Sequence, residues 1–254
     1  MIEHLDLSSV VAEQPDPLLF ATVSGAHLYG FPSRDSDVDL RGVHLLPVDA
    51  LVGLREAEET RSRMWVRDGV EMDLVTHDLR KFVRLMLRRN GYVLEQLLSP
   101  LVVHTSGLHA ELAALAPDVV TVHHAHHYRG FACTQWRLFE KNDELKALLY
   151  TFRALLTGIH LMRSGEVVAH LPTLCGTVGE APAYLGELIA AKAEAEHAPA
   201  AGTDPERLRA DVEALHRTLD DARAASPLPD AVTGAYDALH DLVVRARLGQ
   251  HVQG

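Results

Sequence analysis

The order of strand-like and helix-like segments is the feature that most constrains the fold of this chain. Residues 17–77 contain short apolar or alternating runs that stop at turn residues, whereas the sequence after residue 78 has the pattern of helices almost throughout. An apolar run at residues 18–23 and an alternating run at residues 37–46 predict two strands. We therefore expect a sheet-forming part followed by a helical part.

A second pair of strands is predicted on both sides of an Asp-Gly dipeptide. The runs at residues 61–66 and 70–76 flank Asp68 and Gly69, and such a pair indicates a hairpin because both turn positions need positive φ. The sheet should therefore have at least four strands.

Helix signals follow directly after the hairpin. Asp78 is placed as the N-cap of a helix that reaches Arg89, and a short helix is expected at residues 92–98. Asp204 followed by Pro205 is a typical helix start. The further helices are expected at residues 107–115, 118–141, 144–164, 181–196, 205–224 and 228–248, with an exposed linker at residues 194–205.

Composition narrows the class of protein. A chain of 254 residues with 47% hydrophobic and 23% charged residues has the balance of a soluble globular protein. It has no long apolar stretch and no recognisable leader, so we expect a cytoplasmic protein without a membrane partner. Cys133 and Cys175 lie far apart without metal-ligand spacing, so we expect buried free thiols.

The net charge of −11 argues against binding of long nucleic acid by phosphate neutralisation alone. A local basic patch remains open, because Arg80, Arg84 and Arg88 would share one face of the helix after Asp78. The alternative is an ordinary solvated helix face.

The stretch most informative about chemistry is residues 23–42. In an extended strand, residues two apart point to the same side, so Asp37 and Asp39 would present two carboxylates together while Val38 and Leu40 face the core. Adjacent carboxylates repel each other unless a cation lies between them. Hard oxygen ligands of this kind suit Mg²⁺ or Mn²⁺.

A glycine turn stands upstream of this pair. Gly25 ends the first predicted strand and begins a short helix, where backbone N–H groups can bind phosphate oxygens. A metal-binding carboxylate pair beside a phosphate-binding turn is what phosphoryl or nucleotidyl transfer requires.

These residues resemble the predicted nucleotidyltransferases of the DNA polymerase β superfamily, in particular its RNA-repair-pathway branch. The superfamily pattern is a glycine followed by Gly or Ser, then Asp-hydrophobic-Asp, then a later acid; Gly25, Asp37 and Asp39 match its first two elements. Branch-like details occur at residues 27–30, 36–42 and 71–95. The resemblance covers about the first hundred residues well and the helical half weakly, near residues 146–156.

The resemblance implies a fold and an activity. The fold would be α/β or α+β, with a polymerase β-like nucleotidyltransferase domain at residues 1–104 that has a small, mixed, mostly antiparallel sheet, and an α-helical domain at residues 105–254. The activity would be Mg²⁺- or Mn²⁺-dependent transfer of an NMP from an NTP to an acceptor hydroxyl, with release of pyrophosphate. The acceptor stays open among an RNA end, a protein side chain and a small molecule, as do the NTP used and the oligomeric state.

The resemblance also implies roles for the acidic residues. Asp37 and Asp39 would hold the metal, and Asp73 would serve a second metal and activate the acceptor hydroxyl. Glu71 lies on the same strand face, but the family pattern has its acid directly before a hydrophobic pair, here Leu74-Val75, which favours Asp73.

The nucleotide-binding residues are expected around the turn. Gly25 and Ala26 would hold phosphates through backbone N–H groups, although Ala26 replaces the usual serine and puts nucleotide affinity in doubt. Arg41 could bind a phosphate or neutralise the carboxylates, and these alternatives stay open. Ser36 favours a local turn hydrogen bond over a substrate contact, and His27 is either a substrate contact or a surface residue.

The sequence allows three other interpretations. The cluster of His123, His124, His126 and His127 favours a polar helix face over a metal site. The spacing of Arg153 and His160 resembles the motif of HEPN-type ribonucleases, against a packed or ion-paired Arg153. A catalytically weak, partner-binding or antitoxin-type module is the third alternative.

Overall fold

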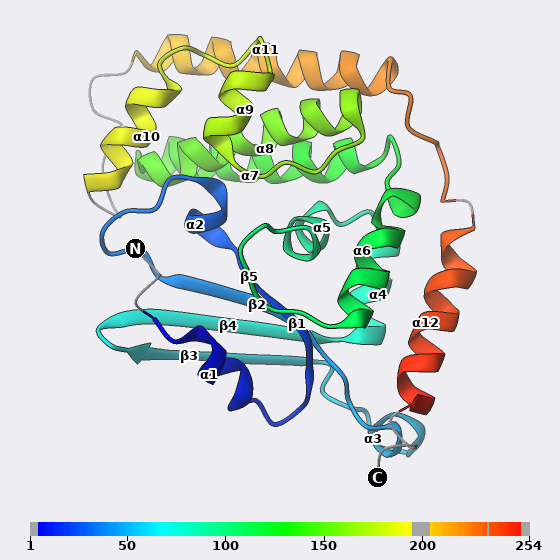
Figure 1. Ribbon diagram of the computed structural model, residues 1–254. Coiled ribbons are helices and arrows are strands. Elements are labelled where there is room, and N and C mark those ends of the chain that lie inside the picture. Colours follow the sequence, from blue (N-terminus) through cyan, green and yellow to red (C-terminus); the bar gives the residue numbers. More distant parts are fainter. Residues whose placement is uncertain (1–4, 195–203, 233, 250–254) are drawn as a thin grey trace. The chain divides into compact units, whose positions relative to one another are not determined.

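The computed structural model describes residues 5–194, 204–232 and 234–249 (Figure 1). The chain forms two compact units, and neither is continuous in sequence. The first comprises residues 1–25, 37–119 and 232–254, and the second comprises residues 26–36 and 120–231. The division expected after residue 104 therefore differs from these units, because residues 105–119 and the C-terminal segment belong with the sheet.

The first unit is built on a five-stranded mixed sheet with the order β3-β4-β2-β1-β5. Strands β2 and β4 are parallel, and the other neighbours are antiparallel, which confirms the expected small mixed sheet with flanking helices. The strands are β1 (Leu18–Val23), β2 (Val38–His44), β3 (Thr60–Arg67), β4 (Val70–Asp78) and β5 (Val102–His104).

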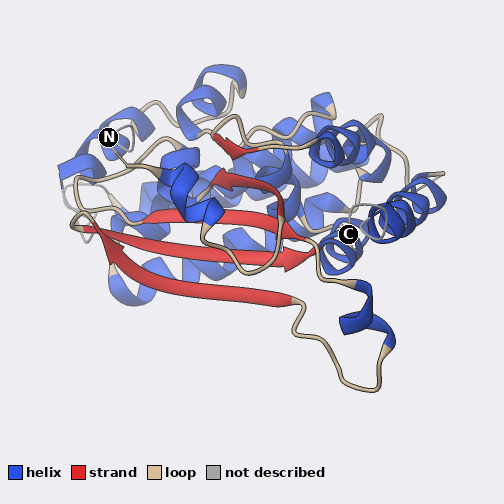
Figure 2. Cartoon of the chain, turned by 60° about the horizontal axis from the view of Figure 1, so that its bottom comes forward, coloured by secondary structure: helices blue, strands red, loops and turns tan. Residues whose placement is uncertain are grey.

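The β3–β4 hairpin has the turn that its sequence predicts. Asp68 and Gly69 have φ values of 51° and 81°, as a two-residue turn with positive φ at both positions requires. Strand β3 is at the edge of the sheet, as the view in Figure 2 shows.

The two faces of the sheet differ in what covers them. On one face Leu40 and Leu74 belong to a core cluster with Val10 of helix α1 (Leu7–Ala12). On the other face Phe20 packs edge-on against Phe82 at 5.5 Å between ring centroids. That second face carries α4 (Leu79–Leu87), α5 (Gly91–Leu97) and α6 (Gly107–Val119). The unit also includes α3 (Val48–Val52) and α12 (Ala235–Gly249).

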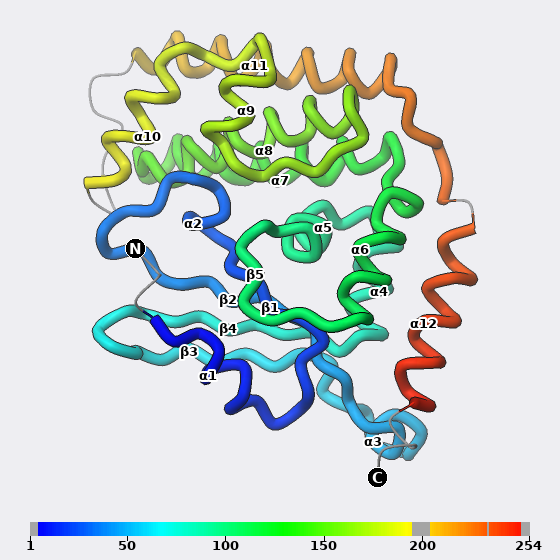
Figure 3. Tube along the Cα trace, in the orientation of Figure 1, coloured from blue at the N-terminus to red at the C-terminus, as the bar shows by residue number. Residues whose placement is uncertain are grey.

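The second unit is helical, and its long helix α8 (Leu145–Ser164) is largely buried among its neighbours (Figure 3). Leu208, Val212, Leu215 and Leu219 form the buried stripe that their spacing predicts. The other helices are α2 (Gly25–Tyr29, whose first residue belongs to the first unit), α7 (His124–Asn142), α9 (Leu171–Thr177), α10 (Leu185–Glu194) and α11 (Pro205–Ala224).

Several predicted helix starts are confirmed. The Asp78 carboxylate accepts the Arg80 N–H at the start of α4, and the Asp204 carboxylate accepts the Glu206 N–H at the start of α11. No helix in the described part of the chain is long and apolar enough to cross a membrane.

Some expectations were wrong in detail. The helix expected at residues 107–115 extends through Pro117 to Val119, and the helix expected to begin at residue 118 begins only at His124. Cys133 and Cys175 are free but half-buried rather than buried. Most of the expected linker, residues 195–203, lies outside the described residues.

A buried ion pair attaches α12 to the sheet. Arg247 donates to the Asp78 carboxylate and to the Leu46 carbonyl, both at 2.5 Å. The Asp78 carboxylate also accepts the Leu46 N–H at 3.1 Å, and Asp78 is fully buried. The pair therefore links residues 169 positions apart in the sequence.

We predict that Arg247→Ala lowers the free energy of unfolding by about 3–5 kcal/mol, because it leaves a buried carboxylate without its cation. The matched control is Arg245→Ala on the same helix, which removes an exposed pair with Glu111 and should change stability little. Urea denaturation measures both. Equal effects of the two substitutions would show that the buried pair does not stabilise this unit.

Candidate active site

Two of the predicted carboxylates lie side by side on neighbouring strands. Asp39 of β2 and Asp73 of β4 are direct partners in the parallel register. Their side chains therefore point to the same face of the sheet, and they are 17% and 23% exposed. The structure thus brings Asp73 next to Asp39, a pairing that sequence spacing alone could not give.

Arg41 bridges these two carboxylates. Its Nη2 atom lies 2.5 Å from Asp39 Oδ1 and 2.8 Å from Asp73 Oδ2, and its Nη1 donates to the backbone carbonyl of Asp73 at 2.7 Å. Its Nε donates to the Tyr92 hydroxyl of α5 at 3.0 Å. Of the two roles left open for Arg41, neutralisation of the acidic pair is the one seen in the structure.

The charge of Arg41 is stabilised by these partners. Burial on its own would lower the pKa of the guanidinium, but Tyr92, Asp39 and Asp73 together raise that pKa above its ordinary value. Arg41 is therefore a permanent cation beside the carboxylates. Its position two residues after Asp39 on one strand was the sequence signal for this pairing, whereas nothing in the sequence pointed to Tyr92.

Gly25 leaves room for the Asp39 side chain. It follows β1 with φ of +60°, and a Cβ atom at this position would overlap the Asp39 carboxylate. The preceding Ser24 N–H donates to the Asp39 carbonyl at 2.8 Å, which holds the two segments together. The Ser24 hydroxyl is buried and has no hydrogen-bond partner among the described residues.

The remaining acidic candidates are placed differently. Asp37 is half-buried and comes one residue before β2 begins, and Glu71 is exposed on β4 two residues before Asp73. Within the described residues, no group of three or more His, Cys, Asp or Glu side chains is placed so that it could hold a metal ion. Metal binding by Asp37, Asp39 and Asp73 therefore stays a prediction.

Three predicted nucleotide-binding residues belong to the second unit, namely Ala26, His27 and Ser36. Ala26 is buried and His27 half-buried. The Ser36 hydroxyl accepts the Ser33 N–H and contacts the Ser33 hydroxyl, both at 2.9 Å, so it makes the local turn bond that was favoured. Contact of these residues with a nucleotide stays a prediction.

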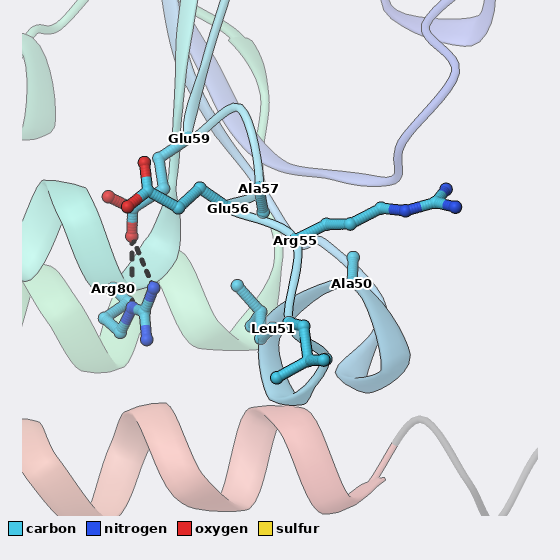
Figure 4. A pocket seen from close by; sticks show the side chains of 9 residues that line it. Ala50, Leu51, Arg55, Glu56, Ala57, Glu59 and Arg80 are labelled. Atoms are coloured by element: carbon cyan, nitrogen blue, oxygen red, sulfur yellow. Dashed lines mark hydrogen bonds and ion pairs between the residues drawn. The ribbon is translucent and has the colours of Figure 1, made fainter.

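One acidic residue, Glu59, interacts with the basic face predicted on α4. Glu59 Oε1 accepts from both Nε and Nη2 of Arg80, at 3.0 and 2.9 Å, and lies 3.6 Å from Arg84. Glu59 and Arg80 also line a pocket of about 440 Å³ between α4 and the segment before β3 (Figure 4). Arg88 is exposed at the C-cap of α4.

Arg153 and the histidine cluster are the two candidate sites in the helical unit, and both are held by contacts within the protein. Arg153 is 3% exposed, and its guanidinium lies 3.8 Å from the centre of the Tyr29 ring, so it is packed against aromatic side chains rather than presented to an RNA phosphate. In the histidine cluster His124 is buried, and His123 lies 2.9 Å from Asp230. These contacts favour structural roles.

Comparisons with known proteins relate this chain to one family and to two individual proteins. The profile of the RNA repair pathway DNA polymerase beta family matches residues 2–245. An uncharacterized protein of Methanocaldococcus jannaschii is 34% identical over 154 residues, which span 58% of this chain and 61% of that protein, less than two thirds of its length. A nucleotidyltransferase-like protein of Exiguobacterium sibiricum, known from a crystal structure, is matched over 86% of this chain and 72% of that chain with 13% identity and a TM-score of 0.33.

We predict that Gly25→Ala lowers the free energy of unfolding by more than the backbone strain of alanine at positive φ alone would. Gly69→Ala is the control, because Gly69 also has positive φ (+81°) but no atom within 4 Å of the added Cβ; it should cost about 1–2 kcal/mol. Gly25→Ala should cost clearly more, since it also displaces Asp39. Chemical denaturation of both variants tests this, and equal losses would contradict the close approach of Gly25 to Asp39.

Proposed function

Because this chain belongs to the RNA repair pathway DNA polymerase beta family, we propose that it transfers a nucleoside monophosphate from an NTP to an acceptor hydroxyl. In this reaction the acceptor oxygen forms a bond to the α-phosphorus, and the bond from that phosphorus to the bridging oxygen of the β-phosphate breaks. Pyrophosphate leaves with the electron pair, and the hydroxyl proton passes to a carboxylate of the protein. The chemistry depends on positioning and on charge neutralisation.

The observation that best supports the proposal is the in-register pair of Asp39 and Asp73. The two carboxylates are partly exposed on the same face of the sheet, where a substrate can reach them. Gly25 lies so close to the Asp39 carboxylate that an added Cβ would overlap it, and glycine is the residue that allows such a close approach at positive φ.

The charges of the proposed donors would suit a hard divalent cation. Asp37, Asp39 and Asp73 together carry three negative charges, and Arg41, bonded to two of these residues, offsets one. The remaining two charges match Mg²⁺ or Mn²⁺, which prefer carboxylate oxygens. When bound, such an ion would neutralise charge on the phosphates and on the attacking oxygen.

The protein's own side chains would have separate roles in the reaction. Asp73 would accept the proton of the acceptor hydroxyl, as a carboxylate close to the reacting oxygen can. Arg41 would hold Asp39 and Asp73 in one arrangement through its two contacts. Near Gly25, the buried Ser24 hydroxyl without a partner is the candidate to bind a phosphate oxygen in place of the serine that is missing at position 26.

The acceptor that we favour is an RNA end. The family's description refers to RNA repair, and the cations of α4 offer a local site for phosphates on an otherwise acidic protein. Arg80 and Arg84 share one carboxylate, Glu59, so this face keeps a positive charge that can attract a polynucleotide.

We predict different consequences for the three carboxylates. Asp37→Asn or Asp39→Asn should weaken Mg²⁺-dependent NTP binding and lower transfer. Asp73→Asn should leave NTP binding nearly intact and lower transfer about 10²- to 10⁴-fold, the usual contribution of a general base. Calorimetric NTP titrations with and without Mg²⁺, paired with rates of labelled NMP transfer to short RNAs, measure both properties.

The control for this series is Glu71→Gln, because Glu71 shares the strand face with Asp73 but is exposed and outside the pair. Its effect should be small. A loss of transfer in Glu71→Gln but not in Asp73→Asn would show that the wrong acid has been chosen. If none of the four substitutions alters Mg²⁺-dependent NTP binding, the assignment of the active site is wrong.

A further inference from the structure

The sheet face that carries Asp73 continues onto the edge strand β3. In the antiparallel register Met64 is the direct partner of Asp73, and Val66 is the partner of Glu71. Partners in a register point to the same side. Ser62, Met64 and Val66 therefore extend the face of the carboxylates toward the edge of the sheet.

This part of the face is exposed and apolar. Met64 is 77% exposed and Val66 is 64% exposed, although edge strands usually avoid exposed apolar side chains because they promote unwanted association. The arginines of β3 point to the opposite face, where Arg63 and Arg67 pair with Glu13. We call Met64 and Val66 the β3 platform.

The same strand begins beside a group of cations. The Lys81 ammonium contacts the Thr60 hydroxyl, which places Lys81 over the first residue of β3. Arg80 and Arg84 lie close by and share Glu59, so three cations stand against one carboxylate. Burial and the neighbouring Lys81 lower the pKa of His77 to about 4, so this histidine, the partner of Thr60, is neutral at pH 7 and adds no charge.

The cations lie near the first residue of β3, and the β3 platform lies further along the same strand. Met64 comes four positions after Thr60, which is about 13 Å along an extended strand. A positive end attracts phosphates, and an exposed apolar end offers a surface on which the face of any base can pack. Methionine suits this role because its side chain is flexible and polarizable.

We propose that this face binds the 3′ end of a single-stranded RNA, with the terminal base on the β3 platform and the preceding phosphates near Lys81 and Arg84. The inference rests on the proposed function, because it places the terminal 3′ hydroxyl next to Asp73. The proposal also predicts which kind of RNA 3′ end is bound. Asp73 and the exposed Glu71 flank the platform, so a 3′-phosphate would be repelled where a 3′-hydroxyl is accepted.

The test is binding of a ten-nucleotide single-stranded RNA with 2-aminopurine as its last base, without NTP. The fluorescence of this base should change on binding, and the same probe at the fifth position should change less. Met64→Ala combined with Val66→Ala should weaken binding about tenfold, because the variant removes apolar surface that the terminal base would cover. Lys81→Gln combined with Arg84→Gln should also weaken binding and reduce its salt dependence, and a 3′-phosphorylated RNA should bind more weakly.

The matched control is Leu138→Ala combined with Tyr236→Ala, which truncates two exposed apolar side chains on α7 and α12 rather than on β3 or α4 and should leave RNA binding unchanged. Because Met64 and Val66 are exposed, their truncation should not unfold the protein. Unchanged RNA binding in the platform variant would overturn the proposal, as would a platform that binds a serine-containing peptide but no RNA. Mg²⁺-dependent NTP titration of the same variant should match the wild type, so a failure of the platform is distinguishable from a failure of the nucleotide site.

Discussion

Two like charges on adjacent strands impose the constraint on which the candidate site depends. The parallel register places the carboxylates of Asp39 and Asp73 next to each other, and this raises the free energy of the folded state unless a cation lies between them. Arg41 supplies that cation from the same strand as Asp39, and Tyr92 of α5 holds its Nε. Gly25 then leaves space for the Asp39 side chain. The strand register, helix α5 and Gly25 thus all support the same arrangement of the Asp39, Asp73 and Arg41 charges.

This arrangement has a consequence for the proposed reaction. A divalent cation at Asp39 and Asp73 must share their carboxylates with Arg41, so its affinity for the protein alone should be modest. An NTP brings negative charge to the site, which offsets both cations at once. We therefore expect nucleotide and metal to bind together, with the open face next to Asp73 left for the acceptor.

Local signals were sufficient for much of the fold. The turn at Asp68 and Gly69, the N-caps Asp78 and Asp204 and the buried stripe of α11 depend on residues close in sequence. The short elements α1, α3, α9 and β5 were not predicted, because segments of three to seven residues are stabilised by their neighbours rather than by their own pattern.

The site was predictable in its residues but not in its geometry. The spacing of Asp37 and Asp39 and the position of Asp73 could be identified from the sequence, yet β2 and β4 are separated by β3 along the chain, so their parallel register depends on the assembled sheet. The choice between the two roles of Arg41 depended on the same register. The pairing of Arg247 with Asp78, which joins α12 to the sheet unit, had no local signal at all.

The most direct test of this account is a titration of Mn²⁺ followed by electron paramagnetic resonance in the wild type, Arg41→Gln and Arg41→Gln combined with Asp39→Asn. If Arg41 and the metal share the carboxylate pair, Arg41→Gln should bind Mn²⁺ about tenfold or more tightly than the wild type, because one competing charge is removed. The added Asp39→Asn should reverse that gain. Equal Mn²⁺ affinity in all three proteins would contradict the assignment of Asp39 as a metal ligand that shares its carboxylate with Arg41.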